Sequence, residues 1–554
     1  MIGCDRGRTN SPPRLRVYAV VAALGLITFL VVYGPGHLLG TSAYWQLPQA
    51  DERMALIGYR YFLHESWHWP IFLSHAVNVP YAKSVAFLDC IPLWALINKS
   101  IATLIPPWES FSSTAYLGLW HGLTYALQPV FGVACVRALG HTSWRTALVT
   151  AVFCIAVPTW IFRYAHPALS AHWLILWALS LYLRTPAGAP TPRRLGLARL
   201  AQLVVATLVT PYHAALSLSI YVPSVLRSRD RSSIAMWLPL GLACVALACW
   251  FAGYFAPEAA RAQWGFDKES ANLLGWLVPL RSGILGDARW LANPEATPWQ
   301  YEGYAYLGLG VLVLLALYAP HVRSLRGAIA RHRWLVAVVV ISALFALSNH
   351  VYFGSHEIAS YRIPSVLRWV RDQFRSPGRF VWVPTYALLI FLLHQAFTRF
   401  ATPRRFAILA LAATLQLVDA TGDWRLQRLT TNGPQGQLLE TAIWRPIVHA
   451  HGAVMILPPY GCVTGDDAEI HDHASLEIQL LASERGLPIN GTYSARDMRH
   501  CAAEESEWPT LALVPGTLSV LLPQAFAVAD RFVADGARCT TFAYGRYCAR
   551  DAVR

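Results

Sequence analysis

The chain has 554 residues, of which 55% are hydrophobic and 14% are charged, and its mean hydropathy is positive at +0.37. This composition excludes an ordinary soluble enzyme and predicts a polytopic membrane protein. The formal net charge of +14 invites a nucleic-acid partner, yet only three residues are lysine and no basic run contains interleaved aromatic residues. We therefore expect no nucleic-acid partner and look for the origin of the charge in membrane topology.

The first apolar segment runs from Val17 to Tyr33, behind a basic flank that includes Arg14 and Arg16. It resembles a signal peptide, but no convincing small-x-small cleavage site follows it. We expect a retained signal-anchor helix with a cytoplasmic N-terminus.

Residues 34–113 form a long external loop that places two adjacent carboxylates, Asp51 and Glu52, at the head of a helical pattern. Apolar side chains fall on one face of this helix and arginines on the other, as in a helix lying on a bilayer surface. The apolar positions are Leu56, Tyr59 and Leu63. Asp51 therefore suits either a helix cap, which is a favoured place for aspartate, or a catalytic position.

Another carboxylate, Asp89, lies in the otherwise apolar run Phe87–Leu93 of the same loop. A carboxylate in apolar surroundings needs a partner or a function. We expect a second amphipathic helix, ending near Ile105, to lie beside the first on the outer surface.

Apolar stretches of about 17 to 25 residues predict a bundle of about eleven transmembrane helices. Nine of them are continuous, near residues 17–33, 114–136, 146–162, 168–183, 233–253, 303–319, 334–348, 381–398 and 405–420. The segment 200–226 is interrupted by Thr210-Pro211 and has arginines on both flanks, so the positive-inside rule makes it a hairpin of two short helices.

The same rule places the C-terminus outside and leaves only Asp5 and Asp230, of 31 acidic residues, inside. The positive charge thus reflects insertion geometry. The sequence divides into a membrane domain, 1–420, and an external α/β domain, 421–554. Within the latter we expect strands at Ala453–Leu457 and Leu518–Leu522 with a helix from Ala474 to Glu484 between them.

Four cysteines lie in this external domain, where an oxidising compartment permits disulfide bonds. Four cysteines allow three pairings, of which we favour Cys462 with Cys501 and Cys539 with Cys548. Metal ligation is the alternative, although no C-x-x-C spacing supports it.

Several polar residues collect at the outer ends of the predicted helices. Ionisable groups at membrane depth are costly and mark a polar pathway or site, and broken helices often contribute to one. The alternative for each histidine is a structural residue with satisfied hydrogen bonds. These residues are Arg163 and His166 in an outer turn, His172 shortly after it, and His213 at the broken hairpin.

A further external segment, Arg368–Trp382, contains four arginines and so runs against the positive-inside trend. An anionic ligand would account for them, because guanidinium groups bind phosphate through two parallel hydrogen bonds. Salt bridges to external carboxylates are the alternative. We select Arg379, directly before a span, with Arg375 as its partner.

This arrangement resembles the GT-C glycosyltransferases, which combine an outward first loop carrying an acidic residue, helices in that loop, a bundle of about eleven spans and an external C-terminal domain. Local strings are similar to a poorly characterised bacterial family of GT-C-like membrane proteins. These strings are Phe87–Leu93, Arg163–Leu169, Phe374–Trp382 and Asn490–Arg496.

The resemblance implies transfer of a sugar from a polyprenyl-phosphate donor to a periplasmic glycan, lipid or protein by an enzyme of the bacterial inner membrane. Asp51 matches the acidic position that the superfamily uses for catalysis or metal binding. Many members carry Asp-Asp or Glu-Asp there, whereas Asp51-Glu52 is followed at once by Arg53, which leaves the acting carboxylate open.

The chemistry agrees with the residues themselves, since glycosyl transfer needs a base for the acceptor hydroxyl and a cationic site for the departing phosphate. Asp51 or Glu52 suits the first role, and Arg379 with Arg375 or Arg163 the second. No cofactor is specified, and a divalent metal stays open. Two rival classes are a transporter or flippase of lipids or glycans, and a non-enzymatic envelope assembly protein.

Overall fold

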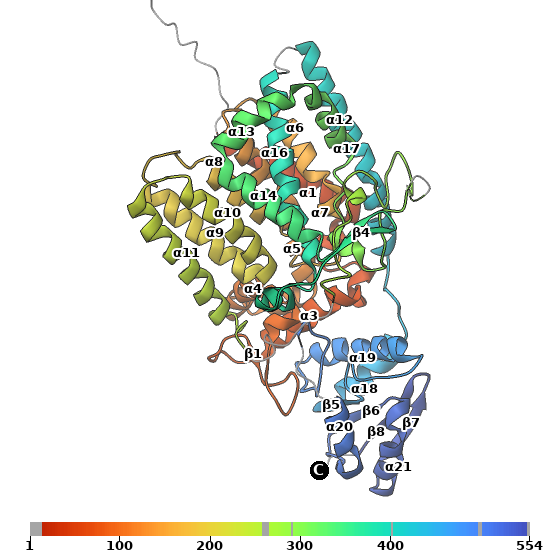
Figure 1. Ribbon diagram of the computed structural model, residues 1–554. Coiled ribbons are helices and arrows are strands. Elements are labelled where there is room, and N and C mark those ends of the chain that lie inside the picture. The colour runs from red at the N-terminus through yellow and green to blue at the C-terminus, as the bar shows by residue number, and fades with distance from the viewer. Residues whose placement is uncertain are drawn as a thin grey trace, which may run out of the picture.

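The computed structural model describes residues 14–256, 265–287, 289, 292–399, 403–496 and 501–550. A bundle of helices forms most of the molecule, and a small sheet domain lies at one end of it (Figure 1). The bundle helices are α1 (Arg14–Tyr33), α5 (Pro107–Ala138), α6 (Trp144–Ile155), α7 (Pro158–Ile161), α8 (Trp173–Leu183), α9 (Arg193–Val209), α10 (Pro211–Leu226), α11 (Arg231–Phe251), α12 (Leu309–Tyr318), α13 (Leu325–Arg331), α14 (Arg333–Ala346), α16 (Trp382–Arg399) and α17 (Pro403–Thr430).

Each segment expected to be a span contains a helix, and the chain is a multi-pass membrane protein. Within the described residues, four helices are long and apolar enough to cross a membrane, or five if a bent pair that includes α12 and α13 forms one span. The four are Leu15–Tyr33, Arg231–Phe251, Pro377–Arg399 and Phe406–Thr430. Most of the other bundle helices are shorter, and α5, although it has 32 residues, is not apolar enough, so the number eleven stays a prediction.

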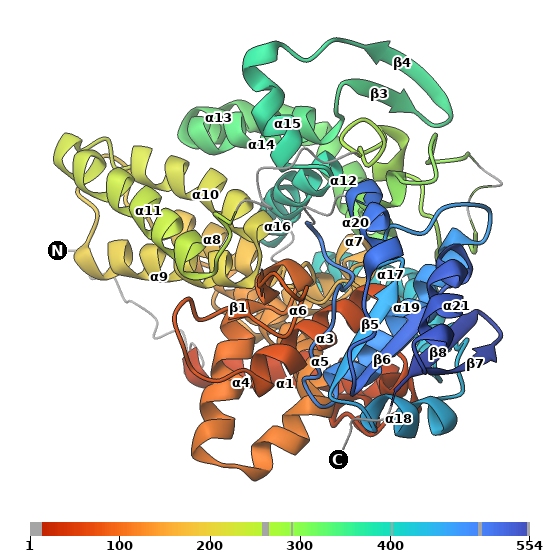
Figure 2. The same cartoon turned by 90° about the horizontal axis from the view of Figure 1, so that it is seen from below.

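The expected break near residue 210 has a clear local cause. Thr210 is extended and Pro211 occupies the first turn of α10, where its missing N–H costs no helical hydrogen bond. Helices α9 and α10 pack side by side, as expected for a hairpin (Figure 2).

Residues 34–113, the loop expected outside, fold into a small layer at the end of the bundle that contacts the C-terminal domain, called the outer end below. Its helix α3 (Ala50–His64) is buried from Glu52 to Leu63, because α5 packs on one side and the C-terminal domain on the other (Figure 1). The prediction that this helix lies on an open bilayer surface is therefore wrong, whereas the second helix is confirmed as α4 (Pro92–Leu104). The layer also contains α2 (Pro35–Leu38), η1 (Ala43–Gln46), β1 (Leu73–Ser74), β2 (Lys83–Ser84) and η2 (Val85–Leu88).

The C-terminal domain contains a four-stranded sheet in the order β5-β6-β8-β7, in which β5 and β6 are parallel and the other pairs antiparallel. The predicted strands are confirmed as β5 (Ala453–Leu457) and β6 (Thr517–Leu521), and the predicted helix as α19 (Ala468–Ser483). The remaining elements are α18 (Thr441–His449), α20 (Cys501–Glu507), η10 (Trp508–Thr510), η11 (Pro523–Ala525), α21 (Phe526–Ala534), β7 (Arg538–Phe542) and β8 (Gly545–Ala549).

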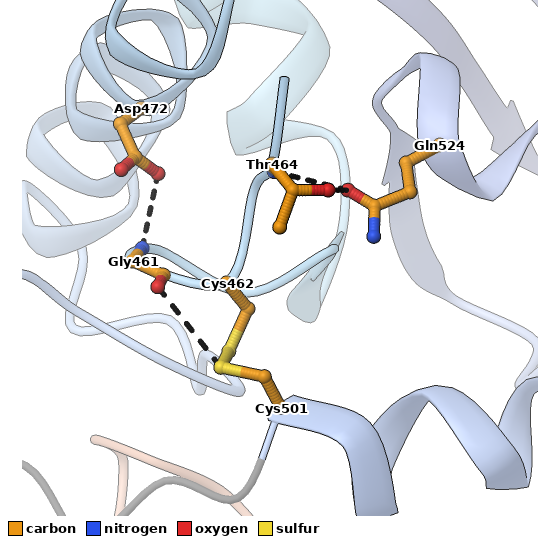
Figure 3. The surroundings of a disulfide bond; sticks show 6 residues. All are labelled: Gly461, Cys462, Thr464, Asp472, Cys501 and Gln524. Atoms are coloured by element: carbon orange, nitrogen blue, oxygen red, sulfur yellow. Dashed lines mark hydrogen bonds between the residues drawn. A yellow bond between two sulfur atoms is a disulfide. The ribbon is translucent and has the colours of Figure 1, made fainter.

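Both favoured disulfide pairings are confirmed. Cys539 and Cys548 join β7 to β8, and Cys462 joins Cys501 at the start of α20. Figure 3 shows the second bond beside Gly461, whose N–H donates to Asp472 over 3.0 Å.

Residues 489–496 of the C-terminal domain are hydrogen-bonded to the first external loop. Ile489 donates to Ala76, and Ala495 donates to Phe87, each over 2.8 Å. One hydrophobic core contains residues of α3, α5 and α19, so the two regions share their buried surface. Tyr493, in the same segment, contacts the polar cluster described next.

The outer loops between α11 and α12 and between α14 and α16 complete the outer face. They contain η4 (Leu274–Trp276), η6 (Gln300–Gly303), β3 (His350–Phe353), β4 (His356–Ser360), η8 (Ser365–Leu367), α15 (Arg368–Gln373) and η9 (Pro377–Val381), while η7 (Ala319–Ser324) follows α12. Here Gly378 packs on Gly303 so closely that a Cβ at Gly378 would lie 2.5 Å from the Cα of Gly303. Two glycines thereby allow η9 to meet η6.

Candidate functional site

Asp51 lies in the first turn of α3 with its side chain 30% exposed. Gln49 occupies the cap position, so the alternative that Asp51 is the helix cap is wrong. Its Oδ1 accepts a hydrogen bond from the hydroxyl of Tyr493 over 2.9 Å, and its Oδ2 lies 3.1 Å from Nε2 of His166. The carboxylate is thus held by the C-terminal domain and by the loop between α7 and α8.

His166 links Asp51 to a second carboxylate, because its Nε2 also lies 3.5 Å from Oε1 of Glu302. Burial alone would lower the pKa of His166, but Asp51 and Glu302 together raise that pKa above its ordinary value. The positively charged imidazolium is therefore favoured between the two carboxylates.

Glu302, in η6, binds two arginines at one oxygen. Its Oε2 lies 2.7 Å from Nη1 of Arg163 and 3.0 Å from Nε of Arg379. Although burial by itself raises the pKa of Glu302, the guanidinium groups of Arg379 and Arg163 hold it well below its ordinary value. Arg379 thus forms a salt bridge, which was the alternative to an anionic ligand, through one of its nitrogens.

Sequence reasoning missed Glu302 and Tyr493. Glu302 carries one signal, a carboxylate directly before an apolar segment in an outer loop, but nothing in the sequence pairs it with Arg163, 139 residues away. Tyr493 lies in a string that the resemblance singled out, yet only the fold brings it to Asp51.

Arg375 is more open than Arg379. Its side chain is 36% exposed, and its Nε makes a long ion pair of 3.8 Å to Glu269, which also accepts from the hydroxyl of Ser376. The guanidinium of Arg379 lies over the ring of Tyr212, 4.5 Å from the centroid.

A basic cavity of about 600 Å³ adjoins Glu269, whose N–H donates to the cavity-lining Gly265. Four cationic side chains contribute to its lining, with one carboxylate, Asp267, among them. The four are Lys268, Arg362, Arg368 and Arg371. The lining of this cavity therefore has a net positive charge, which favours an anionic ligand.

Asp89 lies near Asp51, His166, Arg375 and Arg379, and these residues are called the outer group below. It ends η2 in the left-handed conformation, with φ of 51°, and burial together with the nearby Asp51 raises its pKa to about 6, against the opposing effects of Arg379 and His166. The structure therefore brings Asp89 within electrostatic reach of Asp51, His166 and both arginines.

Glu52 lies apart from this group. Its side chain is fully buried and accepts a hydrogen bond from Tyr44, while Nε2 of His121 lies 3.3 Å from its other oxygen. Burial raises its pKa to about 8, against the lowering effects of Tyr44 and His166. An acceptor molecule has no direct path to this carboxylate.

His172 and His213 do not contact Asp51 or its partners. Nδ1 of His172 lies 2.9 Å from the hydroxyl of Tyr386, and Nε2 of His213 lies 3.2 Å from the carbonyl of Leu169. Both side chains are fully buried, and the ring of Trp382 packs against them. Each ring therefore has one hydrogen-bonded nitrogen, whereas Nε2 of His172 and Nδ1 of His213 are buried without a partner, so the alternative of a structural histidine with satisfied hydrogen bonds is met only in part.

Within the described part of the chain, the carboxylates around Asp51 do not form a cluster of three metal ligands. The positive charge that balances Glu302 comes from Arg163 and Arg379. The site as described is thus built from carboxylates, one histidine and guanidinium groups.

Comparisons with known proteins place this geometry in context. A family model described as a domain of unknown function (DUF6311) matches residues 22–421, and the model of the DUF6311 C-terminal domain matches residues 443–549. No curated protein matches the sequence. The cryo-EM structure of the arabinofuranosyltransferase AftD from Mycobacteria is similar in fold, with a TM-score of 0.57 and 15% identity.

That similarity covers 98% of this chain and 40% of AftD, so the chain spans less than half of the length of the protein that it resembles. Since AftD is a GT-C arabinofuranosyltransferase, the resemblance to the GT-C fold that the sequence suggested is confirmed.

Proposed function

This chain belongs to the family described as the domain of unknown function DUF6311, and we propose that it is a membrane glycosyltransferase. It takes a sugar from a polyprenyl-phosphate donor and transfers it to a glycan, lipid or protein on the periplasmic face of the bacterial inner membrane. The observation that carries the proposal is a partly exposed carboxylate, Asp51, in one outer group with the exposed guanidinium of Arg375.

Asp51 is the general base, and Glu52 is part of the scaffold. The acceptor hydroxyl gives its proton to Asp51 while its oxygen forms a bond to the anomeric carbon. The bond between that carbon and the phosphate oxygen breaks, and its electron pair leaves with the polyprenyl phosphate. The reaction is balanced without a nucleotide or a redox partner.

Arg375 and Arg379 stabilise the departing phosphate. Arg375 is partly exposed, and Arg379 pairs with Glu302 through its Nε, so the terminal nitrogens of both guanidinium groups are assigned to the phosphate. Donors fixed before the reaction stabilise developing charge better than water does. Arg163, fully buried against Glu302, orients Arg379 through their shared carboxylate.

The C-terminal domain takes part in the site through Tyr493. A hydroxyl that donates to Oδ1 of Asp51 fixes the orientation of the carboxylate and leaves Oδ2 to share a proton with His166. The domain therefore completes the active site.

The test uses purified full-length protein in vesicles loaded with a radiolabelled polyprenyl-phosphate sugar, together with candidate acceptors. The proposal expects label to move from the lipid to an acceptor, and Asp51→Asn to abolish that movement. Movement of intact labelled lipid between leaflets would favour the flippase class instead. Retention of all label on its original lipid, with a panel of glycan, lipid and protein acceptors, would favour an assembly protein.

A further inference from the structure

A group of three metal-ligating side chains lies where α3 ends and the first strand of the outer loop begins. Glu65 caps the C-terminal end of α3, His68 follows it, and His75 comes directly after β1. One ligand atom from each residue lies within 4.8 Å of the other two, and among the described residues this is the one such group.

The distances agree with a tetrahedral ion. Oε1 of Glu65 lies 3.6 Å from Nε2 of His68 and 3.4 Å from Nδ1 of His75. Two ligand atoms that each bind zinc at about 2.0–2.1 Å are about 3.3–3.4 Å apart in a tetrahedron. These two distances are therefore close to those between the ligand atoms of a tetrahedral zinc site.

The nitrogen of His68 gives a second, independent observation. Nε2 of His68 is buried without a hydrogen-bond partner, and at 3.6 Å its separation from Glu65 is too long for a hydrogen bond. A buried ring nitrogen without a partner is costly, and coordination of a metal ion removes that cost.

The carboxylate of Glu65 is oriented for this role. Its Oε2 accepts hydrogen bonds from the hydroxyl of Ser74, over 2.7 Å, and from the N–H of His75, over 3.2 Å, which directs Oε1 toward the two rings. Outer contacts of this kind hold metal ligands in place in known sites. Lys99 donates to the carbonyl of Glu65 rather than to its carboxylate.

We propose that Glu65, His68 and His75 bind a zinc ion. Two imidazoles and one carboxylate suit zinc, and three protein ligands leave the fourth position to water or to an external ligand. The side chain of His75 is 64% exposed, which keeps this position accessible. Glu65 and Asp51 lie at opposite ends of α3, about 20 Å apart at 1.5 Å per residue, so this site is separate from the glycosyl-transfer site.

The test measures metal binding and does not depend on the proposed function. Tag-free full-length protein in detergent is stripped with a chelator and titrated with Co²⁺, whose visible absorption reports tetrahedral coordination. We expect about one Co²⁺ per chain, displaced by one equivalent of Zn²⁺. His75→Ala and His68→Ala should each lose this binding, and Ser74→Ala should weaken it by about 10- to 100-fold.

His350→Ala is the matched control, because His350 pairs with Glu357 at 3.0 Å on another loop and no third ligand among the described residues joins them. It should bind Co²⁺ as the wild type does. His75→Ala guards against misfolding, since most of this side chain is in solvent. A wild type without stoichiometric binding, a His75→Ala variant that binds normally, or equal loss in His350→Ala would each overturn the proposal.

Discussion

The surroundings of Asp51 and of Glu52 differ far more than their positions in the sequence. Asp51 is 30% exposed and faces a histidine, a tyrosine and an open cationic group, whereas Glu52 is fully buried between Tyr44 and His121. Successive residues of a helix point about 100° apart, so one turn of α3 leaves one carboxylate partly exposed and encloses the other. In the proposed function the two carboxylates therefore have separate tasks, one chemical and one structural.

The difference in burial gives these two neighbouring carboxyl groups different chemical properties. Asp51 keeps access to solvent although Tyr493 contacts one of its oxygens and His166 the other. Glu52 lies where α3 packs on α5, and burial raises its pKa to about 8. A neutral, enclosed carboxyl group can receive hydrogen bonds but is a poor general base at neutral pH.

The largest expected effect is that of Asp51→Asn. The amide keeps the size and the contact with Tyr493 but cannot take a proton, so turnover should fall by about 10²-fold or more while donor binding persists. Initial rates of sugar transfer and donor binding, measured on the same vesicles, check this. Near-normal turnover would remove the distinction between the two carboxylates.

The next effect concerns Arg375, the partly exposed guanidinium near Asp89 and Asp51. Arg375→Gln removes an exposed guanidinium, so the donor KM should rise by about tenfold or more, because a charge-assisted hydrogen bond contributes about 1.5–3 kcal/mol. Arg546→Gln, which breaks an ion pair with Asp530 in the C-terminal domain, is the control. Equal effects of both variants would show that net charge, and not the position of Arg375, matters.

A smaller effect should appear in the pH dependence of donor binding. Asp89, with a pKa of about 6, is neutral below that pH and gains a negative charge above it. The donor KM should then rise by about two- to tenfold as pH increases from 5 to 7, since the phosphate is repelled. Asp89→Asn should flatten this profile, and an unchanged profile in that variant would assign the titration to another group.

Glu52→Gln should have the smallest effect on turnover and a measurable one on stability. The pKa of Glu52, about 8, exceeds its ordinary 4.5, so its contribution to stability is full below pH 4.5 and is lost as pH rises through 8. Glutamine stays neutral, and thermal melts from pH 5 to 9 should show a flatter Tm profile in the variant. A loss of transfer activity comparable with that of Asp51→Asn would instead make Glu52 catalytic.

Local sequence patterns determined much of the secondary structure of this protein. The structure contains the helices expected from the apolar segments, the break at Thr210 and the strands β5 and β6. It also contains both favoured disulfide pairings. Each of these features depends mainly on residues that are close in sequence. The positive-inside rule also predicted that Asp51, Asp89, Arg375 and Arg379 lie on one side of the membrane, and the structure gathers them at one end of the bundle.

Tertiary structure decided which of these residues meet. Glu302 joins Arg163 to Arg379, and Tyr493 reaches Asp51 across 442 residues of sequence, because two glycines let η9 pack on η6 and the C-terminal domain binds the first loop. The same domain covers α3, which its amphipathic pattern alone placed on an open surface. Helical periodicity reports that a face is apolar, but the partner that covers the face comes from distant parts of the chain.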